Sequence, residues 1–174
     1  DDLSKLEKKV ELPASAWKVV LIDKDQRAVA SDYSGGIHVG KLSDPASWKK
    51  LDAKLRWSRA MVATKDGRVL IGTEDGKIVA LKTDDSTLAP AVDAHKSGIF
   101  NLKLSSDGTK LLSTSGEGAV KIWNVADLKV EKEIQVGTQA VWDATFAESN
   151  KSVVTVDANR RVNLYSAETG KLVM

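Results

Sequence analysis

Short alternating runs of apolar and polar residues follow one another along the chain, and turn-forming residues separate them. In the clearest stretch, apolar residues alternate with polar ones over 99–104 and again over 120–123, with the short run Leu111-Leu112-Ser113 between them. Alternation with a period of two, bounded by Gly, Asp or Ser, is typical of half-buried β-strands. The pattern therefore predicts strands in these three segments and an outer fourth strand over 130–136.

The same pattern occurs four times. Each occurrence contains a turn-like dipeptide, and the first residues of these dipeptides are 41, 41 and 42 positions apart. The dipeptides are Asp25-Gln26, Asp66-Gly67, Asp107-Gly108 and Ser149-Asn150. A period of roughly 40–45 residues is typical of a β-propeller blade, which is a sheet of four antiparallel strands. Helical repeats would instead need apolar residues at helical spacing, with few glycines and few β-branched residues.

Strands are predicted at matching positions in the other repeats. They cover 17–22, 27–31, 37–40 and 48–51 in the first repeat, 58–63, 69–73, 78–81 and 88–92 in the second, and 141–146, 153–156 and 162–165 in the fourth, followed by 170–174. We therefore expect one all-β domain over 1–174, a β-propeller segment of about four four-stranded antiparallel blades. The repeats cover approximately 13–52, 53–93, 94–136 and 137–174.

Residues 1–12 precede the first complete set of inner strands. They resemble 130–136 in pattern, and each segment comes shortly before a tryptophan. We expect them to form the outer strand of a preceding blade; a short amphipathic helix is the alternative, since Leu3, Leu6 and Val10 also have helical spacing. A surplus outer strand indicates an incomplete ring, because propellers cover their blade edges. The ring would then be completed by further blades or by a second copy of the chain, with a closed four-bladed monomer as the third arrangement.

The composition is that of an ordinary globular protein and points to no charged partner. Hydrophobic residues make up 42% and charged residues 29%, and the net charge is only +2. This balance gives no reason to expect nucleic acid or a membrane surface as a partner, and no apolar stretch is long enough for a membrane helix. The chain contains no cysteine, which excludes disulfides and thiolate metal sites but is compatible with cytosol or periplasm alike.

Four segments of the third repeat resemble the WD-repeat (WD40-type) β-propeller family. They are Ala94-His95, Ser106-Asp107-Gly108, Leu112-Ser113-Thr114-Ser115 and Val120-Lys121-Ile122-Trp123-Asn124. The resemblance implies a hydrogen-bonded structural tetrad, which maps here onto His95, Ser113, Glu117 and Trp123. Such a chain of contacts would satisfy four buried polar groups at once. The match marks a divergent member, since Glu117 replaces the usual Asp and Asn124 follows the tryptophan.

The sequence contains no motif that predicts catalysis. It has no phosphate-binding glycine loop, no metal-binding histidine pair and no nucleophile elbow. His95 would be the candidate general base, but its expected neighbours are those of the tetrad. His38, in a third strand, is expected at a strand edge. We therefore expect a protein that is not an enzyme and that has no catalytic residues, no cofactor and no metal.

A binding face is the remaining candidate for function. In this fold the loops between blades and the turns between second and third strands meet on one face of the ring. Those loops and turns supply six candidate partner-binding residues: Trp57, Arg56, Arg59, Tyr33, Glu74 and Arg160. Tryptophan and arginine dominate interface energetics. Trp57 is the best candidate for an exposed anchor, with packing between blades as the alternative, whereas Trp17 and Trp142 are expected in the core between blades.

The leading hypothesis is a non-catalytic scaffold that binds a protein or peptide on this face. The first alternative is an accessory or regulatory propeller domain of a larger enzyme or sensor protein. The second is a small-ligand-binding or catalytic propeller, against which the lack of repeated inward His, Asp or Glu residues argues. Besides a protein or peptide, the partner would include whatever completes the ring, either a second copy or another propeller segment.

Overall fold

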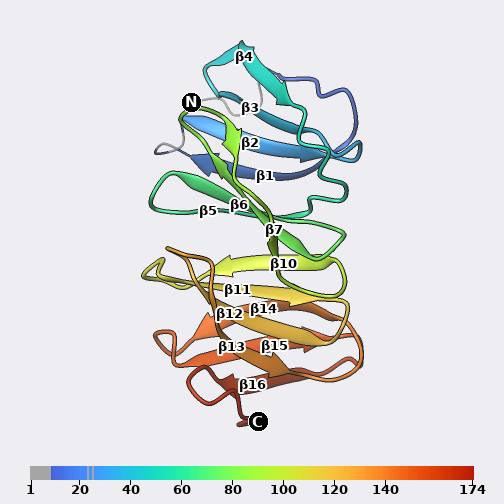
Figure 1. Ribbon diagram of the computed structural model, residues 1–174, viewed down its shortest axis with the longest axis vertical. Helices are drawn as coiled ribbons and strands as arrows, with labels where there is room; N and C mark the ends of the chain where they lie inside the picture. The colour runs from blue at the N-terminus through green and yellow to red at the C-terminus, as the bar shows by residue number, and fades with distance from the viewer. Residues whose placement is uncertain (1–8, 23, 25) are drawn as a thin grey trace, which may run out of the picture.

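Four antiparallel sheets, here called blades 1 to 4, follow one another along the chain (Figure 1). The computed structural model describes residues 9–22, 24 and 26–174. Within each blade, consecutive strands are neighbours in the sheet. The predicted all-β class with antiparallel blades is confirmed. The strands of the two complete blades are β1 (Ala16–Ile22), β2 (Arg27–Asp32), β3 (Ile37–Lys41) and β4 (Asp44–Leu51) in blade 1, and β10 (Ile99–Leu104), β11 (Lys110–Ser115), β12 (Ala119–Asn124) and β13 (Val130–Gln135) in blade 3.

The other two blades have irregular outer edges. Blade 2 contains β5 (Ala60–Ala63), β6 (Arg68–Gly72), β7 (Lys77–Lys82), β8 (Thr87–Leu88) and β9 (Val92–Asp93). The continuous strand predicted over 88–92 is therefore wrong: β8 and β9 pair separately with β7, and Pro90 between them has no backbone N–H to donate. Blade 4 contains β14 (Val141–Ala147), β15 (Ser152–Asp157) and β16 (Val162–Ser166).

The chain after β16 does not form the regular outer strand that the sequence predicts. Beyond β16, Leu172 makes an isolated antiparallel bridge to Tyr165, so 170–174 turns back along β16 without becoming a named strand. Residues 9–12 carry neither strand nor helix. Residues 1–8 of the predicted outer strand lie outside the described part of the chain, so that prediction stays a prediction.

Turn chemistry explains where the first strand of a blade ends and the second begins. The Asp107 carboxylate accepts hydrogen bonds from the Ser105 hydroxyl at 2.6 Å and from the Thr109 N–H at 2.9 Å. Gly108 follows at φ +76°, a left-handed conformation that favours glycine. Gly67 holds the corresponding position in blade 2 at φ +83°. The Asp-Gly pairs thus close the tight turns between first and second strands.

Apolar cores lie between consecutive blades and hold them together. Val29, Ile37, Ile71 and Leu81 belong to the core between blades 1 and 2. Leu70, Ile99 and Trp123 belong to the core between blades 2 and 3, and a third core joins blades 3 and 4. Burial of such side chains stabilises each blade-to-blade contact by the hydrophobic effect. The blades therefore depend on their neighbours, as expected of a repeat protein.

Two arginines at equivalent positions add polar links between blades. Arg27 of blade 1 donates to the carbonyl oxygen of Thr83 at 3.0 Å, and Arg68 of blade 2 donates to that of Val125 at 2.7 Å. In each case the guanidinium reaches from the second strand of one blade to the end of the third strand of the next blade. The links repeat with the sequence period, so the register between blades is fixed as well as their packing.

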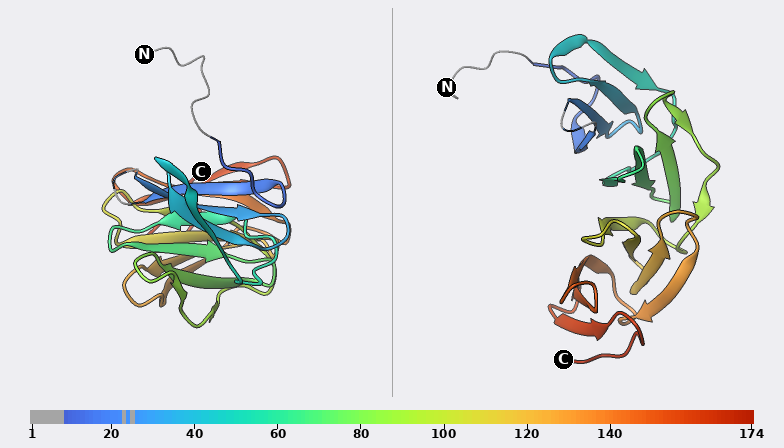
Figure 2. Two further views of the ribbon diagram at one scale, coloured as in Figure 1. Left: turned by 90° about the horizontal axis from the view of Figure 1, so that it is seen from above. Right: turned by 90° about the vertical axis from the view of Figure 1, so that its left-hand side faces the viewer.

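The four blades form an open arc (Figure 2). The innermost strands β1, β5, β10 and β14 contact one another in that order along the concave side. Each end of the arc exposes apolar side chains: Val19 and Leu21 on β1, and Val156 and Val162 on blade 4. No helix among the described residues is long and apolar enough to span a membrane.

Candidate binding face

One side chain from each blade emerges at the start of the innermost strand. The four residues are Trp17, Arg59, Phe100 and Trp142, and they recur 41 or 42 positions apart. The strand register shifts at this position in β1, β10 and β14, between residues 16 and 18, 99 and 101, and 141 and 143. A β-bulge of this kind re-aims a side chain out of the regular alternation. Three aromatic rings are thereby turned away from the cores between blades, and Arg59 lies one residue before β5, whose register has no such shift.

These side chains contact one another in a row across all four blades. The rings of Trp17 and Tyr33 stack with centroids 3.9 Å apart, and Trp57 lies 5.4 Å from Trp17. The rings of Phe100 and Trp142 stack at 4.9 Å. The Arg59 guanidinium connects the two groups, because it lies 4.2 Å from the Phe100 ring and 6.0 Å from the rings of Trp17 and Trp57. We call these five rings with Arg59 the aromatic row.

The structure corrects two expectations about tryptophans. Trp17 and Trp142 were expected in the cores between blades, but Trp142 is 51% exposed and Trp17 is half-buried in the aromatic row. The bulges explain the error, since a one-residue shift in register moves a side chain off the core face. Trp57, for which exposure and packing between blades were both open, is 42% exposed, and its backbone adopts φ +55°.

Five of the six candidate partner-binding residues lie close together. Tyr33, Trp57 and Arg59 belong to the aromatic row. Arg56 is exposed beside Trp57, and its carbonyl oxygen accepts a hydrogen bond from the Glu74 N–H at 3.3 Å. Arg160 lies apart in the β15–β16 turn of blade 4, where it is exposed. The candidate face is thus centred on blades 1 to 3, and sequence analysis missed Phe100 and the exposed Trp142.

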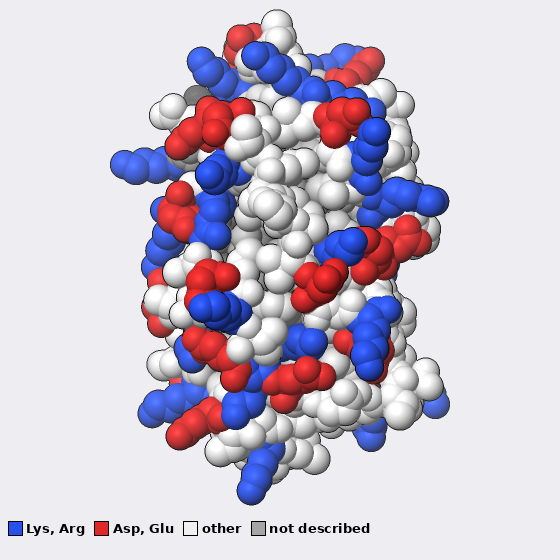
Figure 3. All heavy atoms as spheres, viewed as in Figure 1, with Lys and Arg blue, Asp and Glu red and all other residues white. Residues whose placement is uncertain are grey.

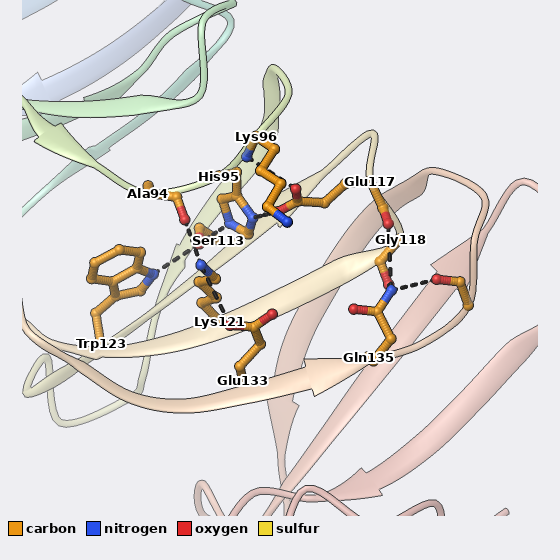
Figure 4. Close-up of polar contacts among 11 residues, drawn as sticks. Ala94, His95, Lys96, Ser113, Glu117, Gly118, Lys121, Trp123, Glu133 and Gln135 are labelled. Atoms are coloured by element: carbon orange, nitrogen blue, oxygen red, sulfur yellow. Dashed lines mark hydrogen bonds and ion pairs between the residues drawn. The ribbon is translucent and has the colours of Figure 1, made fainter.

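A connected group of polar side chains lies within blade 3 (Figure 4). The Trp123 indole N–H donates to the Ser113 hydroxyl oxygen at 2.8 Å. That hydroxyl lies 2.7 Å from His95 Nε2, and His95 Nδ1 lies 2.8 Å from the Glu117 carboxylate. Glu117 also accepts the Lys96 N–H at 3.0 Å. The structure therefore brings together the four residues of the predicted tetrad.

The protonation states follow from burial and from the direction of these hydrogen bonds. Burial lowers the pKa of His95, although the neighbouring Glu117 carboxylate opposes that effect. Burial alone would raise the pKa of Glu117, but its hydrogen bonds from His95 and Lys96 outweigh burial and lower the pKa. His95 is therefore neutral at pH 7 and donates from Nδ1, while its Nε2 accepts the Ser113 O–H. Each donor has an acceptor, so the network is satisfied without a ligand.

Comparison with known proteins identifies the same segment. The family model described as "WD domain, G-beta repeat" matches residues 86–124, which contain the tetrad. The chain carries a WD repeat, the repeat of the WD-type β-propeller family. Residues 86–124 are its best-preserved WD repeat, and the other blades are divergent: Gly40, Leu81 and Tyr165 stand where blade 3 has Trp123.

Two relatives of the WD-repeat chain share a short stretch with it. It is 41% identical over 61 residues to "Protein LST8 homolog" of Drosophila melanogaster and 36% identical over 61 residues to that of Drosophila pseudoobscura pseudoobscura. Each match covers 34% of this chain and only 20% or 19% of the relative. The crystal structure of the computationally designed Ika8 protein superposes with a TM-score of 0.74 at 20% identity. That superposition covers 88% of this chain and 47% of the designed chain, which establishes the fold alone.

Blade 1 of the WD-repeat chain contains a second histidine–carboxylate pair that the sequence did not predict. His38 is not at a strand edge, as expected, but buried on β3 between β2 and β4, with Nε2 2.7 Å from the Asp32 carboxylate. Burial would raise the pKa of Asp32, but hydrogen bonds from Ser34, His38 and Gly36 lower it well below its usual range. The pair is not the counterpart of His95 and Glu117, because Asp32 and His38 occupy the positions of Ser115 and Lys121 in blade 3.

The solvent-facing side chains of this face are aromatic and charged. Within the described part of the chain, no group of three or more His, Asp or Glu side chains is arranged to hold a metal ion. His95 lies in the satisfied network described above and is buried, so the face itself presents aromatic rings, Arg56, Arg59 and Glu74. These groups bind through area, stacking and charge.

Proposed function

We propose that the chain is a non-catalytic WD-repeat scaffold that binds a protein or peptide through the aromatic row and the neighbouring Arg56 and Glu74. The observation that carries the proposal is the row itself: five rings and a guanidinium in contact across four blades, with Tyr33, Trp57 and Trp142 exposed. Contiguous exposed aromatic surface marks interaction sites on soluble proteins. Tryptophan, tyrosine and arginine are also the residues that carry most binding energy at interfaces.

A displayed random-peptide library selected on the immobilised chain tests this proposal. We expect Trp57→Ala to weaken binding of the selected peptides at least about tenfold, because truncation of a central anchor costs about 2 kcal/mol or more. Leu42→Ala is the matched control. Leu42 is also exposed and apolar, but its N–H bonds to Gln26 in the β1–β2 turn, at the other end of blade 1. Equal binding to wild type and the Trp57 variant would show that the row is not the binding face.

We further propose that additional propeller blades cover the two ends of the arc. Val19 and Leu21 at one end and Val156 and Val162 at the other are exposed on sheet faces that internal blades pack against a neighbour. The superposition of most of this chain on 47% of a designed chain supports the interpretation that four blades make about half of a ring. The missing blades belong either to another propeller segment or to a second copy.

Light scattering of the chain in solution distinguishes these two sources. Ring completion by a second copy predicts twice the mass of 18.8 kDa, and Val162→Asp should return the particle to the monomer mass. Thr138→Asp, an exposed position in the loop before β14, is the control and should leave the dimer intact. A wild-type particle of 18.8 kDa would exclude the second copy.

A further inference from the structure

A small cavity opens on the aromatic row between blades 2 and 3. Its volume is about 180 Å³, which admits one side chain and is smaller than a typical site for a drug-sized ligand. It lies where β5 of blade 2 meets β10 of blade 3, and its walls come from both blades. The lining residues are Trp57, Arg59, Glu74, Gly98, Ile99 and Phe100.

Arg59 is the unusual group in this cavity. The central carbon of its guanidinium lies over the Phe100 ring, 4.2 Å from the ring centroid, and 6.0 Å from the centroids of the Trp17 and Trp57 rings. Stacking of this kind occupies the faces of the planar group and leaves its N–H donors, which point outward in the plane, free to form a fork. Aromatic contacts therefore hold the guanidinium in place without using its hydrogen-bonding capacity.

The Arg59 side chain is also half-buried without receiving a protein acceptor. Among the described residues, none accepts a hydrogen bond from the Arg59 side chain or forms an ion pair with it within 4.0 Å. Burial lowers the pKa of Arg59, and the charge of Glu74 opposes that effect from a distance. A partly desolvated cation is stabilised by an anion that restores the lost hydrogen bonds.

We propose that the cavity is a subsite for a carboxylate, an aspartate or glutamate side chain of the bound peptide, which forms a two-pronged ion pair with Arg59. The proposal rests on the proposed peptide-binding function and names the chemistry of one residue of the partner. A carboxylate matches the planar fork of the guanidinium in geometry and charge. Its aliphatic stem would contact the exposed ring of Trp57 in the cavity wall.

Glu74, which lines the same cavity, allows a test of whether the ligand is an anion or a cation. Its exposed carboxylate lies on the rim and would repel an anionic ligand, whereas it would attract a cationic one. The two charged residues therefore make opposite predictions for the two ligand classes. If the ligand is a carboxylate, Arg59→Gln weakens binding and Glu74→Gln strengthens it; if the ligand is a cation, both effects reverse.

An NMR titration of the isotope-labelled full chain measures these effects. Small probes are added, and the tryptophan indole N–H signals report their binding. The probes are N-acetyl-glutamate amide, with a side-chain carboxylate; N-acetyl-glutamine amide, its neutral analogue; N-acetyl-glutamine, with only a terminal carboxylate; and N-acetyl-lysine amide. We expect the glutamate amide to shift the Trp57 and Trp17 signals at concentrations at least about tenfold lower than the glutamine amide does. The buried Trp123 indole, which is bonded to Ser113, serves as the internal control.

The variants then assign the effect to the cavity. Arg59→Gln should remove the preference for carboxylate, and Arg59→Lys should restore it in part, since it retains the charge without the fork. Glu74→Gln should tighten glutamate amide binding about two- to threefold. A preference for N-acetyl-glutamine equal to that for the glutamate amide would support the carboxylate and assign it to a peptide terminus. Equal response to the neutral amide, or a preference for the lysine amide, would overturn the proposal.

The outcome is separable from that of the proposed function. If selected peptides lose binding with Trp57→Ala but bind Arg59→Gln as tightly as wild type, the face is a binding face and the carboxylate subsite is wrong. If the Trp57 variant binds them normally while Arg59→Gln removes the carboxylate preference of the probes, the subsite stands and the peptide-binding role of the row fails.

Discussion

Blades 2 and 3 have the same strand order and share a core, yet they stabilise the equivalent interior in different ways. In blade 3, buried polar groups connect His95, Ser113, Glu117 and Trp123 by three hydrogen bonds. The equivalent positions 41 or 42 residues earlier hold Lys54, Ile71, Asp75 and Leu81. Ile71 and Leu81 are fully buried in the core with blade 1.

The difference shows that the polar network is one solution to filling the blade and not a requirement of the fold. In blade 2 the turn carboxylate, Asp75, bonds locally to the Thr73 hydroxyl at 2.6 Å and pairs with Lys77 at 3.3 Å. No buried partner is left unsatisfied by the change, because the histidine and the hydroxyl were replaced together. Replacing all members of a polar network costs little, whereas removing one member leaves the others without partners.

The largest expected effect comes from converting one member of the blade 3 network to its blade 2 counterpart. Trp123→Leu should lower the free energy of unfolding by about 3 kcal/mol, because it leaves a cavity in a core where Trp123 is fully buried and removes the donor to Ser113. Denaturant titration measures the change. Trp142→Leu is the matched control, since the same substitution at a side chain 51% exposed should cost less than about 1 kcal/mol. Equal losses in the two variants would contradict this account of the network.

The second effect tests what blades 2 and 3 share. Gly76 and Gly118 follow the turn carboxylates at φ +78° and +82°, and a Cβ there would lie 2.1 Å from the carbonyl oxygen of His95 and 2.2 Å from that of Gly137. Gly76→Ala and Gly118→Ala should each therefore destabilise the fold by about 2–3 kcal/mol in thermal or chemical unfolding. Gly137→Ala is the control, because its added Cβ would meet only the end of Arg161 at 3.5 Å. If Gly76→Ala has a small effect and Gly118→Ala a large one, the need for glycine at this turn depends on the tetrad of blade 3 and is not shared by the two blades.

The sequence predicts the β-strands and turns better than the binding face. Strands and turns depend on local sequence, whereas the face depends on contacts between blades. Alternation and turn residues are local, so strands such as β11 and β12 and the Asp107-Gly108 turn follow from the sequence. The tetrad could also be predicted from the sequence, because the spacing of its four residues resembles that of a known repeat. The bulges at Trp17, Phe100 and Trp142 have no local signature, and they decide which side chains leave the core. The stacking of Arg59 on Phe100 joins two blades, and no pattern within one repeat specifies it.

The third prediction uses pH to separate the two blades. The buried His95 has a lowered pKa, so as pH falls below about 6.5 the unfolded chain takes up a proton before the folded chain does. The His95 contribution to stability is therefore full above about pH 6.5 and declines as pH falls. His95→Gln should cost about 1–2 kcal/mol at pH 7.5, through the lost hydrogen bonds to Ser113 and Glu117, and less at pH 5. A cost that increases toward pH 5 would contradict a neutral buried His95, and Lys54→Gln in blade 2 should give a pH-independent control.

The smallest effect concerns Arg160, where blade 4 departs from the rule that blades 2 and 3 obey. Arg160 occupies the turn position of Gly35, Gly76 and Gly118, at φ +63°, a conformation that costs a residue with a side chain about 1 kcal/mol. Arg160→Gly should therefore raise the free energy of unfolding by about 0.5–1 kcal/mol. Arg56→Gly, at an exposed position without positive φ, should lower it by a similar amount.

In blades 2 and 3 the glycine at this turn is needed both for its conformation and because the loop entering the next blade passes against it. A side chain at Arg160 meets only the first of these constraints, so a further blade packed on blade 4, as proposed above, would have to leave room at this turn that the internal blades do not. Stabilisation by Arg160→Gly would show that strain is retained there, and an unchanged or lower stability would show that the arginine makes compensating contacts.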